Sequence, residues 1–485
     1  MKFDEERSFS SLEEVTRLLV GIEGKTFREI DRTGRGAQAG NKGSLGNIIE
    51  ESVLGYAINS DNAPDIIAGG EHYELKVTPL RHTGTGTNLR TVAKERLVVD
   101  VINYMNLPKE DFEHSKFWDK ARQMIIVYYY DDRKDKKAES RLDCKILESF
   151  VLRYRPDELQ TIRKDWELIH QKVSAGHANE LSESDTNYLA ACTKGSTAAK
   201  SWRDAPAPLG SSTLTIKAKQ RAFSYKSSYM TTIANRVLNG DNNMQRLYLS
   251  SQDTLNSYVQ NKIGLYKGQT IKALADKFNL AVSSHYSFNS HLALRMLGTT
   301  SHNPQDIEQF ASANITQVKT SVIYDNNLPE QNMSFPALKQ NDWKELANPY
   351  IDWRDSSLYQ FFEENKFCII VFRAQGKNRK TTDKQNDILL GGFLWNMPEK
   401  DIEQYVKPAW QRVHDLMIHH ESVHYYEEKA NRLPGMSFNH VFHMRPHGRD
   451  GKDTITLPNG ETITKQCWWL DRQYIAKIIA ENICI

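Results

Sequence analysis

The sequence has few cysteines, no long apolar run and almost no net charge, and each of these scarcities excludes a class of protein. Its 485 residues include five cysteines, an odd number with no C-x-x-C pair. This pattern excludes a disulfide framework and a cysteine-rich zinc cluster, and it indicates reduced thiols in a cytoplasm. The longest apolar runs, 124–130 and 367–372, are only as long as strands, and the acidic start MKFDEERSF has no secretory apolar segment. Neither a membrane span nor secretion is therefore expected.

The charge balance restricts where a nucleic-acid surface can lie. The chain has 63 Lys and Arg against 61 Asp and Glu, a formal net charge of +2, so only a local basic patch could bind a phosphate backbone. Between 190 and 230 a single acid, Asp204, faces seven basic residues interleaved with aromatic ones. A basic surface without DNA contacts has the same composition, but the mixture suits a DNA-binding loop. The candidate contacts in this segment are Lys194, Lys219, Arg221 and Lys226.

A short acidic motif carries the strongest chemical signal. From 72 to 78 polar and apolar residues alternate as in a half-buried strand, which places Glu74 and Lys76 on one face, roughly 7 Å apart. A Gly-Gly pair at 69–70 predicts a hairpin bend that brings Asp65 back toward them. Carboxylate oxygens suit Mg²⁺, and a metal-bound water can attack a phosphodiester, so Asp65 and Glu74 are candidate metal ligands of a nuclease. Such a short pattern also arises by chance in exposed strands, which leaves a structural role open.

Two further residues are candidates for the same site. Apolar residues recur at helical spacing from 45 to 58. On a helix of 100° per residue, Glu50 flanks the apolar arc and Glu51 points nearly away from it, so Glu50 is the better third acidic residue. A solvent-facing glutamate pair is the alternative. Lys94 stands at the start of the apolar run 97–102, where a lysine beside a carboxylate site can contact a phosphate.

The length of the chain allows two or three domains, and its most breaker-rich stretch, 239–245, predicts the end of the first. We expect domains at 1–240 and 255–485 with a linker at 241–254. Helical patterns in the first domain fall at 9–22, 144–153 and 156–173.

The second half of the sequence echoes the first. Gln317 and Lys319 repeat the spacing of Glu74 and Lys76, and Lys465 precedes an aromatic stretch as Lys219 does. These echoes predict a duplicated domain. A neutral amide at Gln317 is a poor Mg²⁺ ligand, so we expect the second copy to bind DNA without cutting it.

A competing motif must be weighed against the nuclease interpretation. His420 to His424 read H-E-x-x-H, the pattern in which two histidines one helical turn apart bind zinc and the glutamate acts as base. No third ligand is evident downstream. A metalloprotease is therefore disfavoured, and the role of the motif stays open.

Eight segments, taken in order, resemble one family. They read KGSLGNIIEE, PDIIAGGEHYELKVTPL, KERLVVDVINY, LAACTKG, IKAKQRAFSYKSSYMTTI, MSFPALK, MPEKDI and MRPHGRD. In these motifs and their spacing the chain is similar, essentially from end to end, to the Sau-three-A-I family of MutH-like type II restriction endonucleases. The resemblance implies an α/β (α+β) fold of two tandem restriction-endonuclease domains, each with a mixed central sheet flanked by helices.

The resemblance also implies a reaction, Mg²⁺-dependent double-strand cleavage of DNA at GATC, with the first domain catalytic and the second degenerate. By position, the catalytic set falls on Glu50, Asp65, Glu74 and Lys76, with Lys94 on a phosphate and the readout loop near Lys194. In the second domain, the expected DNA contacts are Arg445, His447 and Lys465.

Binding groups without catalytic ones fit an effector domain, so two DNA sites are expected. The alternatives are a mismatch-repair nicking endonuclease of the MutH type and a DNA-binding regulator that does not cut. The sequence leaves the oligomeric state open, between a monomer and a dimer that forms on DNA.

Overall fold

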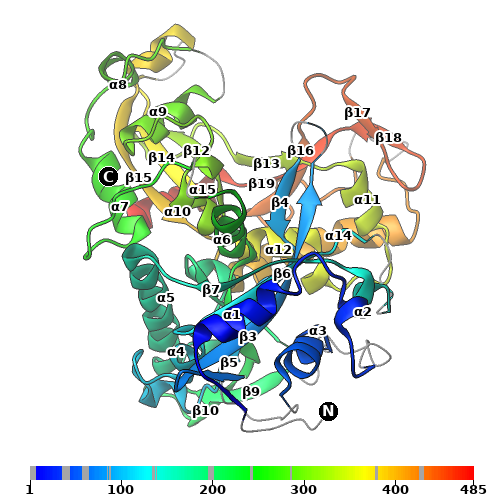
Figure 1. Cartoon of the computed structure of the whole chain (residues 1–485). Helices are drawn as coiled ribbons and strands as arrows, with labels where there is room; N and C mark the ends of the chain where they lie inside the picture. The colour runs from blue at the N-terminus through cyan, green and yellow to red at the C-terminus, as the bar shows by residue number, and fades with distance from the viewer. Residues whose placement is uncertain are drawn as a thin grey trace. The chain divides into compact units, whose positions relative to one another are not determined.

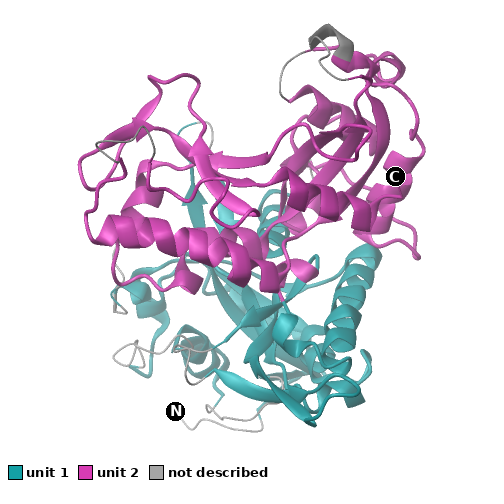
Figure 2. Ribbon diagram, turned by 180° about the vertical axis from the view of Figure 1, so that it is seen from behind, with its two compact units in different colours: residues 1–181, 186–243 teal, residues 182–185, 244–485 magenta. Residues whose placement is uncertain are grey.

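The computed structural model describes residues 7–34, 44–56, 65–84, 86, 89–133, 137, 139–194, 201–240, 244–283, 287–376, 381–424 and 431–484. The chain divides into two compact units, coloured separately in Figure 2. Unit 1 comprises 1–181 and 186–243, and unit 2 comprises 182–185 and 244–485. None of the described helices is long and apolar enough to cross a membrane, and the five cysteines are free thiols.

Unit 1 is built on a mixed six-stranded sheet (Figure 1). Its long strand β3 pairs in parallel with β6 and antiparallel with β2 and β4, while β6 pairs antiparallel with β7 and β2 pairs in parallel with β1. The predicted strands at 72–78 and 124–130 are confirmed as parts of β3 and β6. The strands are β1 (Ser8–Phe9), β2 (Ile66–Ala68), β3 (Glu71–Thr83), β4 (Arg90–Ala93), β6 (Met124–Tyr130) and β7 (Ile146–Leu152).

A second sheet of unit 1 carries the segment expected to read DNA. Strand β11 lies between β5 and β8 and pairs antiparallel with both, and a separate hairpin of β9 and β10 is inserted between β8 and β11 in the sequence. These strands are β5 (Leu97–Val101), β8 (Leu189–Thr193), β9 (Trp202–Pro206), β10 (Thr215–Lys219) and β11 (Arg221–Tyr225).

Helices cover the sheets of unit 1. The N-terminal helices bury apolar side chains such as Val15, Phe27 and Ile48 against Leu75 and Val127 of the large sheet. The predicted helices at 9–22 and 156–173 are confirmed as α1 and α5. The helices are α1 (Leu12–Val20), α2 (Phe27–Ile30), α3 (Ser44–Ile48), a π-helix (Ile49–Leu54), α4 (Lys116–Ala121), α5 (Pro156–Ser174) and α6 (Ser227–Asn239), with 3₁₀ turns at Leu107–Lys109, Glu139–Asp143 and Ala178–Glu180.

The helix predicted at 144–153 is wrong, because this segment contains strand β7. Its buried residues Ile146, Ser149 and Leu152 recur every three positions, which looks helical. Between Tyr128 and Tyr129 of β6 the ladder skips Leu147 of β7, and this extra residue accounts for the step from Ile146 to Ser149. The polar stretch 81–90 begins and ends in strand, since β3 continues to Thr83 and β4 starts at Arg90.

Unit 2 repeats the strand order of unit 1 with shorter sheets. Strand β12 pairs in parallel with β14, which pairs antiparallel with β15, as β3, β6 and β7 do. Strand β19 lies between β13 and β16, as β11 lies between β5 and β8, and a β17–β18 hairpin precedes it. The strands are β12 (Ile315–Ile323), β13 (Met333–Ala337), β14 (Lys366–Arg373), β15 (Ile388–Trp395), β16 (Phe442–Pro446), β17 (Thr454–Thr456), β18 (Thr462–Thr464) and β19 (Gln466–Leu470).

The helices of unit 2 enclose a larger aromatic core, with Trp343, Phe362 and Phe367 fully buried. They are α7 (Leu255–Gly264), α8 (Ile271–Lys277), α9 (Phe288–Met296), α10 (Glu308–Ser312), α11 (Gln340–Leu346), α12 (Ser357–Glu364), α13 (Glu399–Asp401), a π-helix (Ile402–Val406), α14 (Lys407–Ile418) and α15 (Arg472–Asn482), with 3₁₀ turns at Glu183–Asp185, Pro304–Asp306, Trp353–Asp355 and Thr381–Asn386. The matching strand order is the arrangement expected of a duplicated domain.

Candidate active site

A tight hairpin places Asp65 beside the strand that carries the other candidate residues. Strands β2 and β3 are joined by the two residues Gly69 and Gly70, whose φ angles are 60° and 82°. Positive φ at both positions is what a two-residue hairpin turn requires, and glycine adopts it without steric cost. The bend returns the chain so that Oδ2 of Asp65 accepts a hydrogen bond of 2.9 Å from the backbone N–H of Leu75. The predicted hairpin is therefore confirmed.

Glu74 and Lys76 lie together on β3 as the alternation predicts. Lys76 Nζ is 2.6 Å from Glu74 Oε1. The Glu74 side chain is only 5% exposed, whereas that of Lys76 is 21% exposed. The second carboxylate oxygen of Glu74, Oε2, is buried and has no hydrogen-bond partner.

Glu50 reaches the same place from a π-helix. The regular helix α3 widens at Ile49, and the next residue is Glu50. A π-helix turns through a smaller angle per residue than an α-helix, so the 100° wheel fails here: Glu51 is buried instead of pointing away. Glu50 itself lines the cavity described next, as predicted.

The four candidate residues line one cavity of about 670 Å³. Glu50, Asp65, Glu74 and Lys76 contribute to its wall. Burial, followed by repulsion from Asp65 and Glu74, raises the pKa of Glu50 to about 7. Burial and the neighbouring Glu74 raise the pKa of Asp65 to about 6, even though the Leu75 hydrogen bond acts in the opposite direction. Three carboxylates are thus held closer together, and farther from water, than their charges favour.

This arrangement fits a divalent cation. Among the described residues, no group of three or more His, Cys, Asp or Glu side chains has the arrangement to hold a metal by itself. Mg²⁺, however, is commonly held by one or two carboxylates together with water and substrate phosphate oxygens. The unpartnered Oε2 of Glu74 and the raised pKa of Asp65 are both relieved by a nearby positive charge. Asp65 and Glu74 are the pair that would hold it.

The opposite part of the cavity is basic, which the sequence reasoning missed except for Lys94. Lys94, Arg133 and Arg141 line this part together with Asp131 and Glu95. Lys94 Nζ lies 2.8 Å from Asp131 Oδ2, and Arg133 Nε lies 2.8 Å from Asp131 Oδ1. The signal in the sequence is weak, because the two arginines fall in the charged stretch 131–141, which reads as an ordinary polar loop.

Two of the predicted DNA contacts in unit 1 are accessible. Lys194 is exposed immediately after β8, at the start of the connection to the β9–β10 hairpin. Lys219 is half-buried at the end of β10, with its Nζ 6.0 Å from the centre of the Trp202 ring. Lys200, another basic residue of this segment, lies outside the described residues.

The other two predicted contacts are structural. Arg221 is 2% exposed and donates from a terminal guanidinium nitrogen to the carbonyl of Ala191 at 2.6 Å. Lys226 is 5% exposed and donates from Nζ to the carbonyl of Thr186 at 2.7 Å. Their burial argues against direct DNA contact, because a buried cation bound to backbone carbonyls positions strands rather than presenting its charge.

The corresponding position in unit 2 has lost its carboxylate. Gln317 and Lys319 of β12 pair with β14 as Glu74 and Lys76 of β3 pair with β6. Lys319 Nζ donates to the carbonyl of Ser334 at 2.6 Å. Burial lowers its pKa to about 8. This lysine is held by the backbone of a neighbouring strand and not by an acidic partner.

The predicted DNA contacts of unit 2 are on its surface. Arg445 and His447 are exposed at the end of β16 and just beyond it, and both lie against Trp469, at 5.4 Å from its ring centre. Lys465 is half-buried, with its Nζ 2.5 Å from Asp453 Oδ1. The group resembles the exposed end of β8 in unit 1, where Lys194 lies.

The H-E-x-x-H motif is not on a helix. Helix α14 ends at Ile418, and His420 adopts a φ of 50°, in the left-handed region. Glu421 forms an ion pair with Arg432, and His424 lies in an isolated bridge. The zinc-protease geometry requires both histidines on one helical face, so the structure excludes it.

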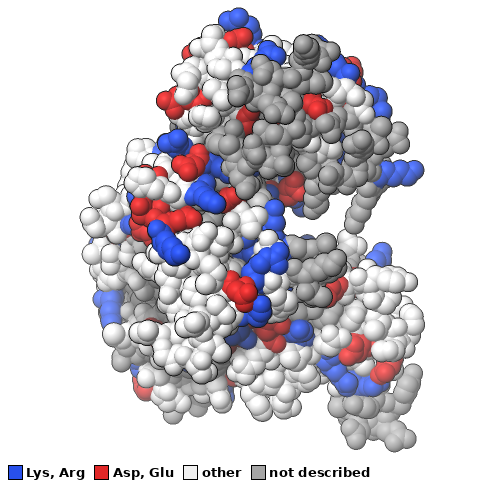
Figure 3. All heavy atoms as spheres, turned by 90° about the horizontal axis from the view of Figure 1, so that it is seen from below, with Lys and Arg blue, Asp and Glu red and all other residues white. Residues whose placement is uncertain are grey.

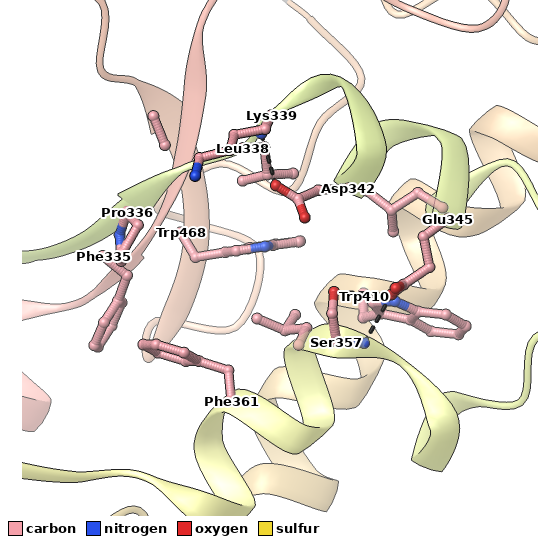
Figure 4. A pocket seen from close by; sticks show the side chains of 13 residues that line it. Phe335, Pro336, Leu338, Lys339, Asp342, Glu345, Ser357, Phe361, Trp410 and Trp468 are labelled. Carbon is pink, nitrogen blue, oxygen red and sulfur yellow. Dashed lines mark hydrogen bonds between the residues drawn. The ribbon is translucent and has the colours of Figure 1, made fainter. Parts of the chain in front are cut away.

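A second cavity, of about 260 Å³, lies in unit 2 (Figure 4). Its lining is largely apolar and includes the aromatic residues Phe361, Trp410 and Trp468. The carboxylate of Asp342 at its rim accepts a 2.6 Å hydrogen bond from the backbone N–H of Lys339 and so caps helix α11. The polar groups drawn there serve helix ends, and we assign this cavity no part in the chemistry.

Charged side chains of both signs are interspersed among the described residues of the face drawn in Figure 3. This matches the small net charge of +2. DNA attraction therefore depends on local groups such as those around the cavity of unit 1.

Comparison with known proteins shows similarity to two kinds of DNA-cutting enzyme. A family model described as the DNA mismatch repair enzyme MutH matches residues 54–165, which include Asp65, Glu74, Lys76 and Lys94. The type II restriction enzyme Sau3AI of Staphylococcus aureus is 30% identical to this chain over 483 residues. The alignment covers 91% of this chain and 93% of that enzyme.

Removing one of the crowded carboxylates should stabilise the protein when no metal is present. We expect Asp65→Asn to raise the free energy of unfolding at pH 8 by about 1–3 kcal/mol, because the wild type carries a charge that burial and Glu74 disfavour. The wild-type penalty is complete above its pKa of about 6 and fades as the pH falls toward the unfolded value. The gain should therefore drop by about half at pH 5.

Denaturant unfolding in EDTA at the two pH values measures this difference. Asp143→Asn is the matched control, because the Asp143 carboxylate is exposed and its pKa is lowered by Arg28, so its loss brings no gain. Mg²⁺ should stabilise the wild type more than Asp65→Asn. Equal destabilisation of Asp65→Asn at both pH values would contradict the crowding of charge.

Proposed function

This chain belongs to the family of type II restriction endonucleases that includes Sau3AI, so it is a DNA-hydrolysing nuclease, and we propose that it cuts both strands of DNA at GATC with Mg²⁺ as cofactor. The reaction would take place in the cytoplasm, in keeping with five free thiols. The observation that carries the proposal is the meeting of Glu50, Asp65, Glu74 and Lys76 in one cavity. They come from a π-helix, a turn and a strand, so their meeting is a property of the fold.

The roles of the residues follow from their surroundings. Asp65 and Glu74 would hold Mg²⁺, whose charge, when it is bound, offsets the negative charge that develops on the scissile phosphate. Lys76 is accessible and held by Glu74 at 2.6 Å, which suits it to orient and polarise the attacking water. Glu50 has a pKa of about 7, so near neutral pH it can accept a proton at its carboxylate.

The choice of GATC rests on the resemblance of the recognition segments to the family. Lys194 is exposed at the start of the connection between β8 and β11, where a side chain can reach a base edge. Arg203 and Lys217 of the adjoining hairpin are also exposed and would contact phosphates.

We further propose that unit 2 binds a second GATC site without cutting it and acts as an effector. Gln317 offers no carboxylate for Mg²⁺. Arg445, His447 and Lys465 remain at the end of β16 and beside it, where they would contact the second duplex. A second bound site could then change the activity of the first through a coupling free energy. Two GATC sites could be bound by the two units of one monomer or by a dimer that forms on DNA.

Plasmid cleavage tests the reaction. We expect purified protein with Mg²⁺ to linearise a plasmid and to leave ends that map to GATC. Lys76→Ala and Asp65→Ala should lower the cleavage rate by at least about a hundredfold, while binding to a GATC duplex stays within a few-fold of wild type. Arg163→Ala, which removes an exposed ion pair with Glu113, is the control and should leave both unchanged.

The products also separate this proposal from its alternatives. The match to the mismatch-repair family model favours a nicking enzyme as the second candidate. Nicked circles as the end product would support nicking, and intact plasmid with tight GATC binding would support a regulator. Near-wild-type cleavage by both Lys76→Ala and Asp65→Ala would refute the assigned site.

The effector role of unit 2 is tested with plasmids that carry one or two GATC sites. We expect the two-site plasmid to be cut faster, and a short GATC duplex to stimulate cleavage of the one-site plasmid. Arg445→Ala should abolish this stimulation and leave the basal rate on one site unchanged, because Arg445 belongs to unit 2. Equal rates on the two plasmids, with no stimulation, would show that unit 2 is not an effector.

A further inference from the structure

The basic part of the active-site cavity is organised by a single carboxylate. Asp131 directly follows β6, and two cations share its carboxylate. Arg133 donates from Nε to Oδ1 at 2.8 Å and from Nη2 to Oδ2 at 3.0 Å. Lys94 Nζ lies 2.8 Å from Oδ2 and also donates to the backbone carbonyl of Asp131 at 3.1 Å. Arg133 also donates to the carbonyl of Lys137 at 2.9 Å and to Ser140 Oγ at 2.7 Å. Arg133 is thus bound on both sides, and it ties Asp131 to the segment that follows.

The cluster has a buried anchor and an accessible end. The Asp131 side chain is 6% exposed, that of Arg133 18% and that of Lys94 32%. Burial alone would raise the pKa of Asp131, but hydrogen bonds from Arg133 and Lys94 lower it to about 2, so the carboxylate is charged at neutral pH. Arg141, in the 3₁₀ turn Glu139–Asp143, adds a further cation to the same cavity wall.

The charges of this cluster do not cancel. Lys94, Arg133 and Arg141 carry three positive charges against the two negative charges of Asp131 and Glu95, which leaves +1. A surplus of positive charge that faces into a cavity, held by a buried anchor, is the usual composition of a site for an anionic ligand.

The cluster lies farther along the same strand as the catalytic candidates. The backbone N–H of Lys94 donates to the carbonyl of Pro79, and that of Asp131 donates to the carbonyl of Leu80. Pro79 is three residues beyond Lys76 on β3, a distance of about 10 Å. The cluster is therefore close enough to the catalytic candidates to contact another phosphate of the same DNA strand, near the scissile one.

We propose that Lys94 and Arg141 form a binding subsite for another phosphodiester of the cleaved strand, near the scissile bond, with Asp131 and Arg133 as the residues that position them. This inference rests on the proposed nuclease function and extends it. Lys94 and Arg141 contact the DNA backbone, whereas Asp131 acts through them. The subsite fixes the register of the strand across the cavity and contributes equally to specific and random sequences.

Two substitutions with the same change in charge give opposite predictions. Asp131→Asn and Glu95→Gln each remove one negative charge from the lining of the same cavity. If only net charge matters, both should tighten DNA binding. If Asp131 positions the cations, Asp131→Asn should weaken binding about tenfold, because Lys94 and Arg133 lose their charged partner and Lys94 keeps only the backbone carbonyl of residue 131. Glu95→Gln should tighten binding.

The measurement is equilibrium binding of the full-length protein to a GATC duplex and to a random duplex, with Ca²⁺ in place of Mg²⁺, over a range of salt concentrations. Arg141→Gln should lower the slope of log affinity against log salt by about 0.9 on both duplexes, the value for one lost phosphate contact. Arg163→Gln removes an equal charge outside the cavity and should leave the slope unchanged. Circular dichroism confirms that each variant is folded, and Arg141→Gln decides the question if Asp131→Asn does not fold.

Tighter binding by Asp131→Asn, or an unchanged salt slope for Arg141→Gln, would overturn the subsite. This result is separate from failure of the proposed function. A protein that binds both duplexes with the predicted slopes but cuts neither in Mg²⁺ would refute the nuclease and keep the subsite. Cleavage at GATC, together with an unchanged salt slope for Arg141→Gln, would support the nuclease and refute the subsite.

Discussion

Repulsion among three carboxylates is the constraint on which the candidate active site depends. Glu50, Asp65 and Glu74 are drawn into one cavity by a π-helix, a glycine hairpin and a strand, and the fold must support the cost of their proximity. Burial, and after it the neighbouring carboxylates, raises the pKa of Glu50 to about 7 and that of Asp65 to about 6. Lys76 offsets part of that cost through its contact with Glu74. The protein thus maintains a local excess of negative charge, which a divalent cation can offset.

A few residues farther along β3, the uncompensated charge in the same cavity is positive instead of negative. Where the carboxylates leave negative charge uncompensated, Asp131 gathers cations and leaves positive charge uncompensated. A phosphodiester substrate needs both, because its metal ion is held by carboxylates and its flanking phosphates by cations. Parallel pairing of β3 with β6 accounts for this arrangement, since it brings Asp131, at the end of β6, next to Leu80 of β3.

Much of this site could be predicted from sequence because its rules are local. Alternation placed Glu74 and Lys76 on one face, and Gly69 and Gly70 marked the bend that returns Asp65. The failures have non-local causes. An extra residue in β7 interrupts the alternation of that strand, and the π-helix turns Glu51 to a buried position. Nothing in the order of residues distinguishes Arg221, bound to a buried carbonyl, from an exposed cation such as Lys194. The roles of Arg133 and Arg141 depend on partners across the fold, and their side chains carry no periodic signal.

The two units illustrate how a fold can persist while its chemistry changes. Strand order is repeated from β3–β6–β7 to β12–β14–β15, yet Gln317 stands where Glu74 stood. Lys319 donates to a backbone carbonyl, that of Ser334, and burial lowers its pKa to about 8. The exposed group at the end of β16 does not depend on that carboxylate, so it could be retained for binding.

The central claim, that Asp65 and Glu74 hold the catalytic cation, is tested most directly by locating a cation in the chain. Fe²⁺ can replace Mg²⁺ at an oxygen-ligand site, and with ascorbate and peroxide it cleaves the backbone beside its ligands. Mass spectrometry of the fragments identifies the positions of cleavage. The account predicts cuts close to residues 65 and 74, suppressed by excess Mg²⁺ and absent in Asp65→Asn. Cuts confined to another region, such as 420–424, or cuts near 65 and 74 that persist unchanged in Asp65→Asn, would contradict it.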